Sequence, residues 1–134
     1  MKFIRVTGEC DLDFWINPEA ILFVQDDEDS GGVIIATTDK IDEKEADSNI
    51  SDYRKIFANE SFEELESISK TELIKLTSAE DDIRLLVNPK AIIVLRGIED
   101  SENVCVTLKD DSLRDFVVAE SMEQIQSLIE ALPA

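Results

Sequence analysis

The segments Asn17–Ile21 (Asn-Pro-Glu-Ala-Ile) and Asn88–Ile92 (Asn-Pro-Lys-Ala-Ile) carry the same motif at two places in the chain. Proline fixes φ and cannot donate to a sheet ladder, so each motif is predicted to end one strand and turn the chain into the next. The apolar runs Ala20–Val24 and Ala91–Leu95 lack alternation, which is typical of strands covered on both faces. Because one helix cannot cover both faces of a sheet, we predict that each half of the chain covers the other.

The surroundings of the two motifs also match in order. Before each motif an apolar run ends in threonine, and after each motif a Glu-Ser pair opens a helical pattern. The matching segments are Phe3–Thr7 with Leu73–Thr77, and Glu60-Ser61 with Glu120-Ser121. Because these signals recur in the same order, we predict a tandem repeat with a first module over residues 1–69 and a second over 70–134. The first module has an acidic insertion at about residues 40–52.

Each module is predicted to be an antiparallel β-meander followed by a C-terminal helix. The helices should begin with capping boxes at Ser61–Glu64 and Ser121–Gln124, where Ser and Glu or Gln satisfy each other's backbone N–H groups. The predicted fold class is therefore α+β, with the two modules packed about a pseudo-two-fold axis. A chain of 134 residues suits one compact domain of this kind.

The chain is strongly acidic, with a formal net charge of −18 from 31 acidic and 13 basic residues. This charge repels phosphate backbones and anionic lipids, so we expect no direct binding to nucleic acid and none to membranes. It attracts basic surfaces at low salt, which favours a basic protein partner, although an acidic surface can also serve solubility alone. A homo-oligomer is compatible with the pattern as well. Without a signal peptide or a sufficiently long apolar stretch, a cytoplasmic location is predicted.

Residues needed for the common catalytic mechanisms are missing from the sequence. There is no histidine, which removes the most frequent general base and zinc ligand. Cys10 and Cys105 lie at non-equivalent places in the repeat and are expected to stay reduced and structural. The acidic run Asp26–Gly32 lacks the ligand spacing of an EF-hand, and the glycines form no phosphate-binding loop. We therefore predict no catalytic residue, no cofactor and no metal site.

The candidate interface centres on Trp15, the single tryptophan of the chain. Alternation places Trp15 on the nominally polar face of its strand, and the repeat pairs it with Leu86. Aromatic side chains dominate the energetics of many protein interfaces, whereas contact with the other module is an alternative reading of the same pattern. The candidate residues are Trp15 and Leu86, together with Asp42, Glu43 and Glu45 of the acidic insertion.

Four segments of the second module follow one another in a recognisable pattern. They are Leu73–Thr77 (LIKLT), Leu86–Ile92 (LVNPKAI), Val104–Asp110 (VCVTLKD) and Val117–Ile125 (VVAESMEQI). In this order they resemble the short flagellar FlbD-like proteins, which are single small modules. The first module shows the same skeleton more weakly, so the resemblance touches most of the chain. It implies a non-enzymatic accessory module without cofactors.

These observations favour a cytosolic protein-interaction or adaptor module built as an internal pseudo-dimer. The alternative is an acidic decoy that occupies a nucleic-acid-binding protein, with carboxylates standing in for phosphates. An enzyme of unfamiliar type is the third hypothesis, and it would require a deep pocket with convergent carboxylates.

Overall fold

The computed structural model describes residues 3–8, 11–37, 54–109 and 115–133. In the first half these residues form β1 (Ile4–Thr7), β2 (Asp13–Ile16), the 3-10 turn η2 (Pro18–Ala20), β3 (Ile21–Asp27), β4 (Gly32–Thr37), β5 (Arg54–Ala58) and helix α1 (Phe62–Ile68). In the second half they form β6 (Ile74–Thr77), β7 (Arg84–Val87), the 3-10 turn η3 (Pro89–Ala91), β8 (Ile92–Gly97), β9 (Val104–Leu108), β10 (Phe116–Val118) and helix α2 (Met122–Glu130). The order of elements is the same in both halves. The strands of the described residues pair antiparallel, which confirms the predicted α+β class.

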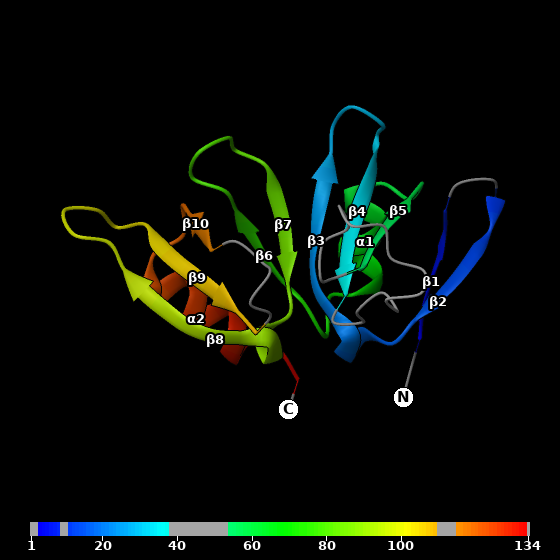
Figure 1. The fold of residues 1–134 in the computed structure, drawn as a ribbon. Helices are drawn as coiled ribbons and strands as arrows, with labels where there is room; N and C mark the ends of the chain where they lie inside the picture. Colours follow the sequence, from blue (N-terminus) through cyan, green and yellow to red (C-terminus); the bar gives the residue numbers. More distant parts are fainter. Residues whose placement is uncertain (1–2, 9–10, 38–53, 110–114, 134) are drawn as a thin grey trace, which may run out of the picture.

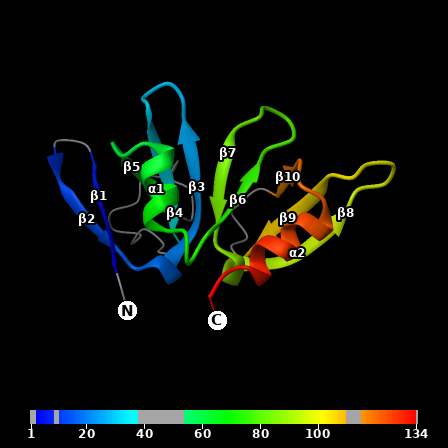
Figure 2. The ribbon, with the colours of Figure 1, turned by 180° about the vertical axis from the view of Figure 1, so that it is seen from behind.

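The described strands belong to three sheets (Figure 1). A five-stranded sheet of order β5-β4-β3-β7-β6 stands in the middle and contains strands from both halves. The two-stranded sheet β1-β2 lies on one outer side of it, and the three-stranded sheet β10-β9-β8 lies on the other. Figure 2 shows the molecule from behind, where α1 and α2 lie on the same side of the sheets.

The two halves meet where β3 pairs with β7. The register sets Phe23 opposite Val87, Val24 opposite Leu86 and Gln25 opposite Leu85. Each strand also keeps its neighbour within its own half, since β3 pairs with β4 and β7 pairs with β6. The junction therefore joins two hairpins into one continuous sheet.

Several local contacts recur at matching places in both halves. The N–H of Thr7 donates to the carboxylate of Glu60 at 2.9 and 3.0 Å, and the N–H of Thr77 donates to Glu120 at 2.9 Å. Isolated β-bridges join Gly8 to Ala58 and Ser78 to Val118. The register shifts between Ile21 and Phe23 in β3, and between Ile92 and Val94 in β8. The shared sequence motif is thus accompanied by shared backbone contacts.

The predicted starts of both helices are confirmed. Ser61 and Ser121 each accept a hydrogen bond from the backbone N–H three residues later, at 3.2 Å, and both capping boxes are complete. The Asn-Pro motifs end β2 and β7 as expected. In each, the asparagine side chain caps a single 3-10 turn by accepting from the N–H two residues on, at 2.9 Å for Asn17 and 3.0 Å for Asn88.

The buried apolar side chains form two clusters, and each cluster contains residues from both halves. The cluster of the first half is completed by Leu73 and Leu86 of the second half. The cluster of the second half is completed by Leu22, Phe23 and Ala36 of the first half. Neither half therefore encloses its core alone.

One expectation about the strands is wrong. Ala91–Leu95 is not covered on both faces, since Ile93 and Val94 of β8 are exposed. β3, in contrast, continues through Val24 to Asp27 by pairing with β4. The physical reason is position: β3 lies inside a sheet, whereas β8 lies at the edge of its sheet. The acidic insertion at about residues 40–52 lies outside the described residues.

Candidate interaction surface

Trp15 is exposed on the β1–β2 hairpin, where 65% of its surface is open to solvent. It pairs with Arg5 across the hairpin, and the Arg5 guanidinium lies 5.6 Å from the centre of the Trp15 ring. Asp13 holds that guanidinium in place through an ion pair of 2.8 Å. A cation over the ring is a weak attraction at an exposed site. The indole nevertheless keeps most of its surface available to a partner.

Two further apolar side chains, Leu12 and Phe14, are exposed beside Trp15. The Phe14 ring lies close over the backbone of Gly8: a Cβ at Gly8 would come within 2.5 Å of Phe14 Cε2 and 3.2 Å of the Phe57 carbonyl oxygen. Gly8 is therefore required for the ring to lie there. Phe57 of β5 is itself exposed on the neighbouring sheet. We call Leu12, Phe14 and Trp15 the hairpin patch.

β2 is also an edge strand, since β1 is its only partner strand among the described residues. An edge strand presents backbone N–H and C=O groups that can pair with another strand. The hairpin patch therefore combines an apolar surface with a row of hydrogen-bonding groups, and a strand from another protein could engage both.

The structure separates the residues that sequence reasoning grouped together. Leu86 is buried, with 2% of its surface exposed, and it packs in the core cluster of the first half. Asp42, Glu43 and Glu45 lie outside the described residues. Of the predicted interface, only Trp15 is found on the surface of the described chain. Sequence reasoning missed the exposed Ile93 and Val94, because an apolar run gives no signal that its strand lies at an edge.

The polar contacts between the halves centre on Arg84. Its Nε and Nη2 atoms donate to Asp26 Oδ2 at 3.0 and 2.7 Å, its Nη1 donates to Glu63 at 2.7 Å, and its guanidinium lies 4.5 Å from the Phe62 ring centre. The hydrogen bond from Arg84 lowers the pKa of Glu63, and the bonds to Glu63 and Asp26 raise the pKa of Arg84. Arg84 therefore forms ion pairs with two carboxylates of the first half and links the two halves at the junction.

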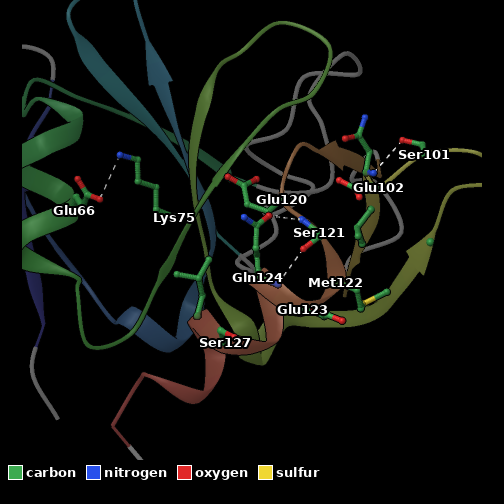
Figure 3. A pocket seen from close by; sticks show the side chains of 14 residues that line it. Glu66, Lys75, Ser101, Glu102, Glu120, Ser121, Met122, Glu123, Gln124 and Ser127 are labelled. Carbon is green, nitrogen blue, oxygen red and sulfur yellow. Dashed lines mark hydrogen bonds and ion pairs between the residues drawn. The ribbon is translucent and has the colours of Figure 1, made fainter.

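An open groove of about 1160 Å³ lies between α1, β6, the connection from β8 to β9 and the start of α2 (Figure 3). Several of its polar side chains have structural partners. Lys75 faces Glu66 at 3.8 Å, Glu120 accepts from Thr77, and Ser121 and Gln124 form the capping box. Two of its four glutamates, Glu66 and Glu120, are therefore engaged in contacts within the fold.

No group of three or more potential metal ligands comes together among the residues that the structure describes. Cys105 is a buried free thiol in β9, and Cys10 falls outside the described part of the chain. Within that part, no helix is both long and apolar enough to cross a bilayer.

Comparison of the chain with protein-family models, with curated proteins and with solved structures finds no match.

Proposed function

We propose that this chain is a non-enzymatic protein-interaction module whose main contact surface is the hairpin patch. The observation that carries the proposal is the exposure of Phe14 and Trp15 on the edge strand β2 and of Leu12 just before it. Single exposed apolar residues are ordinary, but here both faces of one edge strand carry an exposed aromatic side chain, Phe14 on one face and Trp15 on the other. In the groove beside α2, by contrast, Lys75, Glu120 and the capping box at Ser121 are engaged in structural contacts.

We further propose that the module arose as a tandem repeat of a small β-meander with a C-terminal helix. The identical element order, the matching β-bridges and the two glutamates that accept from Thr7 and Thr77 support this idea. A repeat of this kind supplies a scaffold in which equivalent strands take different roles. A duplicated module favours an interaction function over a catalytic one. Duplication gives two copies of each surface but does not by itself bring reactive groups together.

The test is affinity capture with the full chain as bait, from a lysate of the native host. We expect a defined protein to be retained by the wild type and lost with Trp15→Ser, which removes the largest side chain of the hairpin patch. Ile68→Ser is the matched control, because Ile68 is also exposed but lies on α1 away from the patch. Equal retention by wild type and Trp15→Ser would contradict the proposal.

A second candidate function is the acidic decoy. The turn from Asp27 to Gly31 and the turn from Ser78 to Asp82 project from the same end of the five-stranded sheet, because β3 and β7 pair antiparallel (Figure 1). Glu28, Asp29, Glu80 and Asp81 thus gather at one end. Binding of a basic protein there should weaken steeply between about 50 and 200 mM salt. Binding at the hairpin patch should not weaken over that range.

A further inference from the structure

The contact between the halves uses only one edge from each half. β3 of the first half gives its edge to β7 of the second half. In element order, β8 is the counterpart of β3 and β2 is the counterpart of β7. Neither β8 nor β2 has a partner at the corresponding edge among the described residues. The junction is therefore a head-to-tail contact between two different edges. The unpaired edges of β8 and β2 are the same two kinds of edge, so the molecule has the surfaces for a second contact of this type.

The side chains at these edges repeat the same contrast. Aligning Asn17 with Asn88, and Ile4 with Ile74, matches each exposed apolar residue to a buried one. Trp15 is 65% exposed and its counterpart Leu86 2%; Ile93 is 61% and Leu22 0%; Phe3 is 50% and Leu73 4%. Phe14 and Val94 are likewise exposed, whereas their counterparts Leu85 and Phe23 are buried. The exposed apolar residues near β2 and β8 are thus the counterparts of residues that are buried near the β3–β7 junction.

The two open edges do not meet within one chain. β2 lies at one outer side of the molecule and β8 at the other, with the five-stranded sheet between them (Figures 1 and 2). No strand of the described residues covers either edge. The strand whose shape and apolar pattern match the β8 edge is β2, since the pair β3 and β7 already shows that combination.

We propose that a second copy of this chain is the occupant, with β2 of one copy pairing antiparallel with β8 of the other in the register of β3 with β7. This register sets Ile16 opposite Val94, Trp15 opposite Leu95 and Phe14 opposite Arg96. Trp15 then enters the second-half core of the neighbouring copy, as Leu86 enters the first-half core within the chain. The inference deepens the proposed function, on which it rests, by naming the partner of the hairpin patch.

Charge sets the conditions for this contact. The register brings Arg96 of β8 next to Asp13 of β2, which are opposite charges. Each copy carries a net charge of −18, however, so two copies repel at long range. Added salt screens this repulsion and should strengthen self-association. A basic partner would show the opposite salt dependence. Two copies that join at both edges form a closed ring of four modules with neither edge left open.

The first experiment measures the mass of the full chain by sedimentation over a range of protein and salt concentrations. We expect a mass that rises from 15.1 kDa towards twofold with concentration, and more readily at high salt. Trp15→Ser and Val94→Ser should each shift the assembly to monomers, whereas Ile68→Ser should not. An equimolar mixture of Trp15→Ser and Val94→Ser should regain part of the association, because each variant keeps one intact edge. A monomer under all conditions, or association that both variants leave unchanged, overturns the inference.

The second experiment tests the register with Trp15→Cys and Leu95→Cys in separate chains that lack Cys10 and Cys105. Facing residues of an antiparallel pair lie within disulfide range, so mild oxidation of the mixture should link the two chains. Trp15→Cys mixed with Ile68→Cys is the control and should not link. If both cysteines in one dilute chain form an internal link instead, the edges close within the chain and the inference fails. If the chain stays monomeric but Trp15→Ser still loses a captured protein, the inference fails while the proposed function stands.

Discussion

β7 and β2 occupy the same place in the two halves, yet their surroundings differ. Both are the second strand of a hairpin and both precede an Asn-Pro turn. β7 is sandwiched between β6 and β3 and its Leu85, Leu86 and Val87 are buried, whereas β2 has β1 alone and exposes Phe14 and Trp15. The comparison teaches that burial here is decided by the neighbouring strand and not by the strand's own pattern. The side chains agree with their positions, since the exposed strand carries the aromatic residues typical of interfaces.

The largest expected effect comes from truncating the buried member of the matched pair. Leu86→Ala should lower the free energy of unfolding by about 2–5 kcal/mol, because it leaves a cavity in a core shared by both halves. Trp15→Ala should change the stability of the monomer by less than about 1 kcal/mol, since the indole is mostly solvated. Urea denaturation of both variants, at a concentration where the wild type is monomeric, measures the difference. An equal loss of unfolding free energy in the two variants would mean that Trp15 on β2 is buried in the monomer as Leu86 on β7 is.

The next effect concerns the ion pairs of the two hairpins. Arg84→Met should lower stability by about 2–3 kcal/mol, because it leaves the largely buried Asp26 carboxylate without its cation. Arg5→Met removes the exposed pair with Asp13 and should change stability by only about 0–1 kcal/mol. Both variants keep an unbranched apolar stem, so the comparison isolates the charge. Denaturation midpoints that shift equally would argue against a special role for Arg84 at the junction.

A smaller effect is expected for the two capping asparagines. The buried Asn88 side chain caps η3 and also donates from Nδ2 to the Ile21 carbonyl at 2.8 Å. Asn88→Ala should therefore lower stability by about 1–2 kcal/mol, since it leaves that buried carbonyl unpaired. Asn17→Ala loses the cap of η2 alone, at about 0.5–1 kcal/mol. Thermal unfolding of both variants tests the order, which would be refuted if Asn17→Ala were the more damaging change.

The smallest effect is the pH dependence of Glu63. Its pKa is lowered in the folded protein by the hydrogen bond from Arg84, so it contributes stability above its unfolded pKa and loses it as pH falls through the folded pKa. Glu63→Gln should be less stable than the wild type at neutral pH, and the gap should narrow on acidification. Glu123→Gln, at the counterpart position on α2, is the control. Urea midpoints at about pH 7 and about pH 3 provide the measurement, and a gap that stays constant would exclude the Arg84 contact as its source.

Local signals in the sequence predicted the elements well. The Asn-Pro motifs end the expected strands, and Ser61 and Ser121 begin the expected helices, because turns and caps depend on residues close in sequence. The antiparallel pairing follows from short connections, but the predicted meanders are not continuous. β2 and β3 lie in different sheets, as do β7 and β8, so each meander is divided at its Asn-Pro motif. The pseudo-two-fold packing of the modules remains a prediction.

The arrangement of the strands was beyond the sequence. Ala20–Val24 and Ala91–Leu95 have nearly the same apolar pattern, but the first is interior and the second is an edge. No local feature distinguishes them, since the difference lies in whether a distant strand pairs alongside. For the same reason Trp15 and Leu86 could not be separated into a surface and a core residue. The acidic residues Asp42, Glu43 and Glu45 stay predicted interface residues, because they lie outside the described part.

The pairing of β3 with β7 also has a consequence for synthesis on the ribosome. The first half leaves the ribosome before β7 exists, so its core lacks Leu73 and Leu86 and the edge of β3 is bare. At about 5–20 residues per second, the stretch between the two strands takes roughly 3–12 s to be added. The nascent chain therefore passes through an interval in which β3 can accept a strand from a neighbouring polypeptide on the same message. The order of translation thus favours meetings between sibling chains before either has finished folding.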